Sequence, residues 1–448
     1  MKKSAKQFIY LVFALVLFFT GGCRPVVMLD KPYEGRHYAG SYKLSEIFDT
    51  FWQAMNNNYV YWNLETEKYW NSVYDKYYYQ FDDMGLLTPE LFYDENEMPI
   101  TGNALTAYTY FKEMLAPLHD GNLSVDFKKM FFITKNPNGD DVGSFPGQIC
   151  PQDERVSGRP GSNDSKIFLS DWSSDDPTDP NWNFFTAVST YLTNSRSTGS
   201  APVLRAATGR ITHSLGDGKF ISYFYFSSFA IKDSYSYRPE LKSVVDVFSD
   251  SLKQPGFSGL IIDVRGNSGG NFDDISRILS PFLETELKIA YTRTKKTTSP
   301  LDYTSWAPYR IKPAPAAGRA KNIHVPIVLL CNDYTKSSAE LLALAVKRMP
   351  RGIVIGSKTW GSVGPVFDPQ NTTLETGGSF YSDAFWTTVI QSGYQVRDIF
   401  MNDYTGEGIM PDIEIPLNAS AFHSEQADTQ LEAAITYIDP GIDPGRSF

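Results

Sequence analysis

The stretch FSGLIIDVRGNSGGN, residues 257–271, joins an apolar run to a glycine-rich turn. Its first half is almost unbroken in apolar residues, which is typical of a strand buried on both faces of a sheet. The short helix expected after the turn carries Ile275, Ile278 and Leu279 on one side. Pro281 should end or kink that helix. A strand, a turn and a helix in this order indicate one unit of an α/β domain.

The same pattern recurs from residue 219 onward. Further strands are expected at KFISYFYFSSF (219–229), VPIVLLC (325–331) and GIVIG (352–356), and a helix is expected at RPELKSVVDVFSDSL (238–252). After the second of these strands, apolar residues recur at the i, i+3, i+4 and i+7 spacing of a helix. The fold class predicted is therefore α/β. Such folds place their sites at the carboxyl ends of strands, where two polar turns of this chain lie.

The rest of the chain differs in composition. Residues 24–125 are expected to form a helical N-terminal domain, because apolar and aromatic residues recur at helical spacing in LSEIFDTFWQAMNNNYVYWN and YWNSVYDKYYYQF. Residues 126–215 are expected to form a β-rich middle segment, with short strands at MFFIT (130–134) and KIFLSDW (166–172). The acidic cluster SSDDPTDPNWN lacks the ligand spacing of a calcium loop and indicates a solvated loop. Residues 216–440 form the α/β domain.

Length and charge limit the classes of function. A chain of 448 residues is expected to form two or three domains. With 41 Lys and Arg against 51 Asp and Glu, the formal net charge is -10, which argues against a nucleic-acid partner. The 27 Tyr, 30 Phe and 8 Trp suit large cores, and they would equally suit a groove for a peptide or a glycan.

The first 23 residues have the features of an export signal. The lysines of MKKSAK precede an apolar stretch, residues 8–19, that is too short to span ~30 Å of hydrocarbon. The sequence TGGC that follows resembles the lipobox of bacterial lipoproteins, in which the mature chain would begin at a lipid-carrying Cys23. An ordinary signal peptide is the alternative. An exported lipoprotein would reside in the periplasm or at the outer membrane or cell surface.

The remaining thiols and imidazoles do not predict a metal site. Cys150 and Cys331 are expected to be buried and unpaired, because Cys331 ends a predicted buried strand. Five histidines form no pair at ligand spacing; they are residues 37, 119, 213, 324 and 423. The sequence also contains no cofactor motif, so neither a metal nor a cofactor is expected.

Two interpretations fit the second polar turn, TKSSAELLAL, residues 335–344. Ser337 and Glu340 match the capping box S-x-x-E, which satisfies backbone donors at a helix start. The alternative is that Ser337 is a nucleophile. The first turn favours this alternative, since Gly269 and Gly270 allow backbone N–H groups to converge on a small volume, as an oxyanion hole requires.

These turns, read in order, resemble a known family. GLIIDVRGNSGGN, VPIVLLCNDYTKSSAEL, GIVIGSKTWGSVG, GEGIMPDIEI and DTQLEAAITYI are similar to motifs of the C-terminal processing (tail-specific) serine peptidases, which include the tricorn core. The resemblance runs through residues 219–438, and LHDGNLSV (118–125) resembles the tricorn-like branch more loosely. It implies a crotonase-like (ClpP/crotonase-type) α/β catalytic domain. Many members insert a PDZ domain where residues 126–215 lie, but no convincing PDZ pattern is found there.

The resemblance assigns roles to residues of the two turns. It makes Ser337, rather than Ser338, the nucleophile that would form an acyl-enzyme. The backbone N–H of Ser338, with that of Gly269 or Gly270, would hold the oxyanion. Glu340 corresponds to the family's glutamate near the serine and would orient the site.

The chain departs from the family at the general base. The tail-specific branch uses a lysine in an F-G-K-G turn, where this chain has WGSVG with Ser362 at the lysine position. The tricorn-like branch uses a histidine in D-G-H, where this chain has Asn122. Neither a hydroxyl nor an amide replaces such a base. His119, Lys358 and Lys336 are the remaining candidates for a base, and the absence of any base is the other possibility.

The function predicted from the resemblance is serine-type hydrolysis of peptide bonds near the C-termini of unfolded or secreted proteins. Its partners would be protein or peptide substrates and, through the lipid anchor, a membrane. The first alternative is a pseudopeptidase that binds extended chain ends without cutting them. The second alternative is a glycan-binding surface lipoprotein. Its only support is the aromatic content and the predicted lipid anchor.

Overall fold

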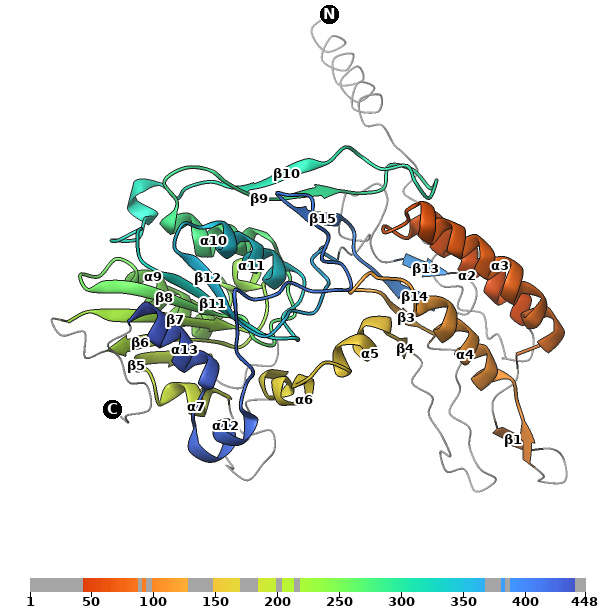
Figure 1. The fold of residues 1–448 in the computed structure, drawn as a ribbon, viewed down its shortest axis with the longest axis horizontal. Coiled ribbons are helices and arrows are strands. Elements are labelled where there is room, and N and C mark those ends of the chain that lie inside the picture. Colours follow the sequence, from red (N-terminus) through yellow and green to blue (C-terminus); the bar gives the residue numbers. More distant parts are fainter. Residues whose placement is uncertain are drawn as a thin grey trace, which may run out of the picture.

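The computed structural model describes residues 43–87, 91–93, 99–127, 148–169, 184–198, 204–212, 218–366, 380–382 and 387–439. The predicted signal segment and Cys23 lie outside the described residues. In Figure 1 a group of helices lies at one end of the molecule and a large sheet covered by helices lies at the other.

The helical end confirms the helices expected in the N-terminal region. Its members are α2 (Leu44–Asn58), α3 (Leu64–Met84) and α4 (Ala104–Leu115). Helix α2 buries Phe48, Phe51 and Met55 along one face, at the spacing that brings side chains onto a common stripe. Asn63 starts α3 with a capping box, because its side chain accepts the N–H groups of Glu65 and Thr66.

The other end is built on a seven-stranded sheet. From one edge to the other, its strands are β16 (Ile413–Glu414), β12 (Gly352–Gly356), β11 (Ile327–Cys331), β8 (Phe257–Asp263), β7 (Phe220–Phe226), β6 (Ala206–Thr212) and β5 (Thr193–Ser197). The run from β16 to β7 is parallel, and β6 and β5 continue it antiparallel. The expected α/β class and the strands expected at 219–229, 257–263, 325–331 and 352–356 are confirmed.

Helices cover both faces of this sheet. On one face lie α9 (Pro239–Ser251), α10 (Asp273–Leu279) and α11 (Ser338–Arg348), and on the other lie α7 (Phe184–Ser189), α12 (Ala419–Glu425) and α13 (Thr429–Ile438). Along β8, Leu260 and Ile262 pack toward the first group while Ile261 packs toward the second. This alternation explains why the strand reads as a continuous apolar run.

Smaller sheets connect the two ends. In a four-stranded sheet of order β13 (Phe380–Ser382), β14 (Thr387–Ile390), β3 (Ser124–Asp126) and β4 (Gln148–Ile149), β14 pairs antiparallel with β3. A segment from the C-terminal third thus pairs with the end of the helical region. A three-stranded sheet holds β10 (Ala307–Ile311), β9 (Leu287–Arg293) and β15 (Gln395–Asp398), and β1 (Leu91–Tyr93) pairs with β2 (Pro99–Thr101).

The described residues of the range 126–215, expected as a β-rich middle segment, include helices as well as strands. They hold the helices α5 (Pro151–Ser157), α6 (Ser162–Ser165) and α7, and Lys166–Leu169, expected as a strand, is the 3-10 turn η2. Phe168 in that turn packs inward against the guanidinium of Arg265, so its burial does not require a strand. The strands β5 and β6 belong to the large sheet, because β6 pairs with β7 along its whole length. MFFIT, at 130–134, lies outside the described residues.

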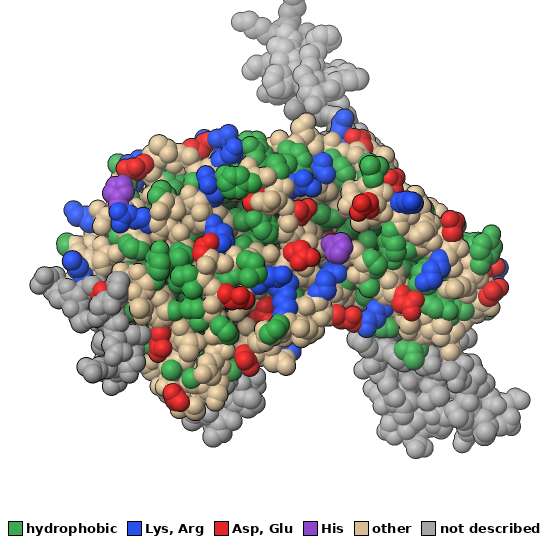
Figure 2. Space-filling view, viewed as in Figure 1, with side chains coloured by type: hydrophobic (Ala, Val, Ile, Leu, Met, Phe, Trp, Pro, Cys, Tyr) green, Lys and Arg blue, Asp and Glu red, His purple; other side chains and the backbone are tan. Residues whose placement is uncertain are grey.

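The cysteines, the length of the helices and the surface charge can be described for the whole of the described chain. Both Cys150 and Cys331 are free thiols, as expected; Cys331 is buried as predicted, whereas Cys150 is only half-buried. No helix among the described residues is both long and apolar enough to cross a bilayer. Figure 2 shows basic and acidic side chains intermixed over the face in view.

Candidate active site

Ser337 occupies a strained position between a buried strand and a helix. Strand β11 ends at Cys331, and Ser337 is the residue directly before α11, with φ 55° and ψ -121°. A residue other than glycine that is held at positive φ costs of order 1–3 kcal/mol in backbone strain, and such residues are found mostly at functional sites. Ser337 is 5% exposed.

The Glu340 side chain caps the start of α11 as the capping interpretation expects, whereas the Ser337 hydroxyl makes no capping hydrogen bond. The Glu340 N–H donates to the Ser337 carbonyl oxygen at 2.9 Å, and the Glu340 carboxylate accepts the Ser337 N–H at 3.1 Å. The same serine also meets the glycine-rich turn. A Cβ placed on Gly269 would lie 2.5 Å from the Ser337 Cβ and 3.0 Å from its Oγ. A helix cap and a contact with the second turn therefore coexist at this residue.

Hydrogen bonds tie the two turns together. The Lys336 N–H donates to the Asn267 carbonyl oxygen at 2.8 Å, and the Gly266 N–H donates to the Asn332 side chain at 2.9 Å. The Thr335 hydroxyl donates to the Val264 carbonyl oxygen at 2.9 Å. The turns lie at the ends of the neighbouring parallel strands β8 and β11, as the sequence predicts.

The backbone amides at this junction are not equivalent. The Gly269 N–H donates to the Asn267 side chain at 2.8 Å and is therefore not free to hold an oxyanion. Within the described part of the chain, the N–H groups of Gly270 and Ser338 donate to no protein acceptor. The Ser338 hydroxyl donates to the Gly270 carbonyl oxygen, which holds these two residues together. Of the two glycines considered, Gly270 is the one whose amide is available.

Glu340 is fully buried and accepts hydrogen bonds from several donors. One carboxylate oxygen accepts the Gly361 N–H at 2.8 Å and the Thr359 hydroxyl at 2.6 Å. The other accepts the N–H groups of Ser337 at 3.1 Å and Ser362 at 2.7 Å. Burial raises the pKa of Glu340, while these hydrogen bonds act in the opposite direction. The side chain thus joins the start of α11 to the loop that contains Ser362.

The two substituted base positions lie side by side. The Asn122 Nδ2 donates to the carbonyl oxygens of Ser362 at 3.4 Å and Gly364 at 2.7 Å. The loops that contain Asn122 and Ser362 approach each other closely, because a Cβ on Gly121 would lie 2.1 Å from the Gly361 carbonyl oxygen. The Ser362 hydroxyl, 3.2 Å from both the Ser337 N and the Glu340 carboxylate, fills the space beside the candidate nucleophile.

The three remaining candidates for a base make other contacts. His119 is an exposed residue whose ring is partly covered, and this partial burial, followed by the charge of Arg155, lowers its pKa. Lys358 pairs with Glu407 at 3.7 Å. The Lys336 ammonium lies 3.3 Å from the ring centroid of Trp360. Among the described residues, no histidine or lysine side-chain nitrogen hydrogen-bonds to Ser337.

A buried ionic network holds the glycine-rich turn in place through Arg265, which is part of that turn. Arg265, which is not exposed, donates to both carboxylate oxygens of Asp263 at 2.9 and 2.6 Å and to both of Asp428 at 2.8 and 2.7 Å. Asp428 in turn caps α13 by accepting the Gln430 and Leu431 N–H groups. The sequence motif DVRG contains Arg265 and the motif DTQL contains Asp428. Nothing in the spacing of the two motifs indicates that these side chains pair.

Helix α5 supports the loop that contains Ser362. Gln152 donates to the carbonyl oxygens of Trp360 and, at 3.1 Å, Gly406. Just after the helix, Arg159 donates to the carbonyl oxygens of Thr359 and, at 3.2 Å, Glu407. Sequence analysis missed these residues because single polar side chains that bind distant carbonyls leave no periodic pattern.

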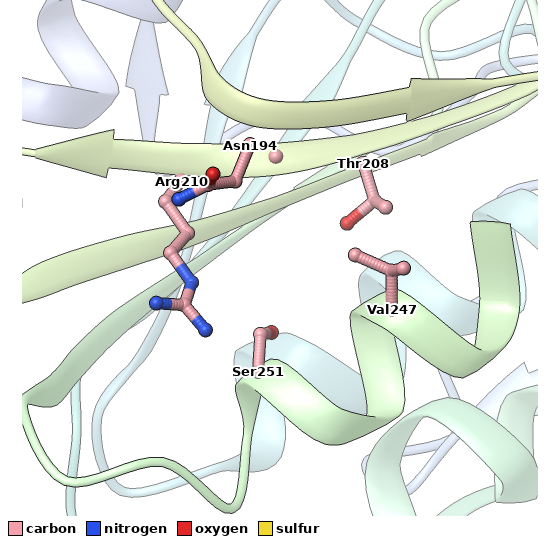
Figure 3. A pocket seen from close by; sticks show the side chains of 6 residues that line it. Asn194, Thr208, Arg210, Val247 and Ser251 are labelled. Atoms are coloured by element: carbon pink, nitrogen blue, oxygen red, sulfur yellow. The ribbon is translucent and has the colours of Figure 1, made fainter.

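Cavities lie at several places among the described residues. A cavity of about 660 Å³ lies between α4, β4 and α5, and His119, Cys150, Asp153 and Arg155 are among its lining residues. A second, of about 310 Å³, lies between β6 and α9 (Figure 3); its wall includes Thr208, Arg210 and Ser251. The described residues contain no group of three or more His, Cys, Asp or Glu side chains placed to hold a metal ion.

Comparison with known proteins agrees with this geometry. Residues 221–415, which include both turns and Glu340, match the model of Peptidase family S41. The α/β domain of this chain is similar to peptidase family S41 over these residues. The S41 match confirms the family resemblance seen in the sequence motifs.

Two curated relatives and one solved structure are similar to this α/β domain. A carboxyl-terminal-processing protease of Synechocystis sp. is 29% identical over 198 residues, which are 43% of this chain and 39% of that protein. A tricorn protease of Thermoplasma volcanium is 25% identical over 181 residues, 40% of this chain and 15% of that protein. The matches thus span less than half of either relative.

The solved structure is that of a Parabacteroides merdae protein described as a peptidase. It is 20% identical, has a TM-score of 0.56, and covers 90% of this chain and 100% of that one. At this identity the likeness concerns the fold alone, and it extends beyond the α/β domain into the helical end.

Proposed function

We propose that this protein is a serine-type peptidase of the bacterial cell envelope that cleaves polypeptides through Ser337. One observation carries the proposal. A strained serine, two free backbone amides and a buried glutamate meet where two parallel strands end. The match of residues 221–415 to peptidase family S41 supports the same chemistry.

In this reaction the Ser337 Oγ forms a bond to a substrate carbonyl carbon. The peptide C–N bond then breaks, the serine proton goes to the departing amine, and an acyl-enzyme remains. The N–H groups of Ser338 and Gly270 would hold the negatively charged oxygen, since they have no other acceptor among the described residues. Water then attacks the acyl carbon and releases the acid product and the free serine.

Proton transfer is the slow part of the proposed reaction. The positions occupied by a base in relatives hold Ser362 and Asn122, and the Asn122 amide already donates to carbonyl oxygens. A positioned base typically contributes about 10²–10⁴-fold to such reactions. We therefore expect slow turnover rather than none.

A second candidate function is favoured by those same two residues. A protein with this site and no base would bind extended peptides without cutting them. Both functions are tested by incubating a disordered protein with the wild-type chain and with Ser337→Ala, and by following cleavage and binding separately. Cleavage that Ser337→Ala abolishes supports the peptidase. Binding without cleavage by either protein supports the second candidate, and neither cleavage nor binding contradicts both.

The location at the cell envelope is part of the proposal. Its support is the lysine-rich start, the apolar stretch and the TGGC sequence that ends at Cys23. Growth of producing cells with labelled palmitate tests it. The account expects label on the wild-type protein and none on Cys23→Ser, and an unlabelled wild-type protein would contradict lipid attachment.

A further inference from the structure

The residue next to the candidate nucleophile carries a cation that pairs with no carboxylate among the described residues. Lys336 lies between Thr335 and Ser337, and its ammonium is seated on the indole ring of Trp360, 3.3 Å from the ring centroid. No carboxylate of the described residues lies within 4.0 Å of it. A cation over an aromatic face is attracted by the ring, but the ring leaves its other side open to an anion.

Trp360 is itself rigidly placed. It is 4% exposed, packs with Val156 and Tyr334, and donates its indole N–H to the Gly121 carbonyl oxygen at 2.8 Å. The Lys336 backbone is fixed as well, because its N–H donates to the Asn267 carbonyl oxygen. The ammonium is therefore held at a defined place beside the site rather than moving freely in solvent.

Lys336 lies near the cavity of about 660 Å³, because Trp360, on which its ammonium rests, packs against Val156 of α5, and α5 forms part of the cavity wall. Burial lowers its pKa, and the neighbouring charges of Asp153 and Cys150, two lining residues of that cavity, act on it in the opposite direction. The volume is in the range of about 300–1,000 Å³ that is usual for ligand sites. Lys336 is thus the chain neighbour of Ser337 and also lies near this cavity.

The other cations of the cavity are already engaged. Lys112 pairs with Glu154 at 2.5 Å. Arg155 donates to the Gln152 side chain at 2.6 Å and to the carbonyl oxygens of Ala116 and Leu118 at 3.1 and 3.0 Å. Among the described residues around this cavity, Lys336 is the cation left to bind a ligand.

We infer that Lys336 and the adjoining cavity form a subsite that binds a carboxylate of the peptide substrate close to the bond attacked by Ser337. The carboxylate comes either from the free end of the chain or from an acidic side chain. The inference rests on the proposed function, since it concerns the substrate of that same site. A partly buried ammonium that meets a carboxylate makes a charge-assisted hydrogen bond, which is stronger than a neutral one.

The test measures binding in the Ser337→Ala protein, so that turnover does not matter. Four fluorescent peptides of alanine and leucine are compared by anisotropy: one with a free C-terminal carboxylate, the same peptide amidated, and two amidated peptides with an internal Glu or Gln. We expect one acid to bind about tenfold more tightly than its neutral counterpart, in line with a charge-assisted contact. The pair that discriminates identifies the source of the carboxylate.

Variants then assign the preference to one residue. Lys336→Met should remove the preference, and Lys336→Arg should retain it. Lys232→Met, which breaks an exposed pair with Asp273, is the control for the loss of one positive charge and should leave the preference unchanged. If Lys336→Met fails to fold, loss of the acid preference at high salt in the Ser337→Ala protein replaces that variant.

The outcomes separate the inference from the proposed function. Equal binding of all four peptides, or a preference that persists in Lys336→Met or at high salt, overturns the inference alone. If no peptide binds at all, both the inference and the proposed action on polypeptides are overturned.

Discussion

The Asn122 side-chain nitrogen lies 3.4 Å from the carbonyl oxygen of Ser362, although 240 residues separate them in the chain. In related peptidases, each of these positions is expected to hold a base, a histidine in one branch and a lysine in the other. Ser362 in turn lies beside the candidate nucleophile, since its hydroxyl accepts the Ser337 N–H at 3.2 Å. Each position is therefore one at which a single substitution could supply a base.

Asn122→His should increase hydrolysis. An imidazole can accept the serine proton near neutral pH, and a positioned base contributes about 10²–10⁴-fold. The rate of cleavage of a disordered protein is the measurement. Asn122→Ala is the control, because it removes the same amide contacts without supplying a base. Equal rates for the two variants would show that the site lacks more than a base.

Gly269→Ala should abolish reaction at Ser337 while leaving most of the fold in place. Gly269 has φ 86°, and an added Cβ would meet the Ser337 Cβ at 2.5 Å. The new methyl group would displace the serine from the amides of Ser338 and Gly270. Gly318→Ala is the matched control, since its added Cβ meets only the Ala314 Cβ, at 3.4 Å. Cleavage rates and circular dichroism report the two effects separately, and an active Gly269→Ala protein would contradict the predicted proximity.

Arg265→Met should destabilise the protein strongly. The change leaves the carboxylates of Asp263 and Asp428 buried without their shared cation, and breaking a buried pair in this way costs about 3–5 kcal/mol. Urea unfolding gives the loss of free energy. Arg310→Met, which breaks a half-exposed pair with Glu286, should cost about 0–1 kcal/mol. Similar losses for the two variants would mean that the buried network does not hold the glycine-rich turn.

Asp333→Asn should stabilise the protein near neutral pH. Burial raises the pKa of Asp333 from 3.8 to about 6, and one of its carboxylate oxygens has no hydrogen-bond partner. The folded state therefore holds the proton more tightly than the unfolded state does, and this carboxyl group destabilises the fold as the pH rises from about 4 to 6. We expect the variant to exceed the wild type by about 2–3 kcal/mol at pH 7 and to match it below about pH 4. A difference in stability that is independent of pH would contradict this origin.

The sequence predicted the parts of the fold whose residues follow a regular period. The strands at β8, β11 and β12 were recognisable because burial on both faces demands continuous apolar residues. The helices at the N-terminal end were recognisable from their spacing. The short turn at Lys166–Leu169 was not, because four apolar and polar residues fit a strand and a 3-10 turn equally well.

The candidate site was only partly predictable. The two turns could be placed together, since carboxyl ends of neighbouring parallel strands share one edge of a sheet. The choice between the amides of Gly269 and Gly270 needed coordinates, because it depends on the Asn267 side chain that occupies one of them. The support from Gln152 and Arg159 arises from contacts across some 200 residues of chain, which no local pattern encodes.

The most direct measurement of the central claim is the reaction of the wild-type protein with a fluorophosphonate probe, followed by mass spectrometry of the modified peptide. A serine beside two free amides should take up the probe at residue 337, slowly because no base among the described residues contacts it, and Ser337→Ala should take up none. A wild-type protein that stays unmodified, or that is modified at Ser338 instead, would contradict the account.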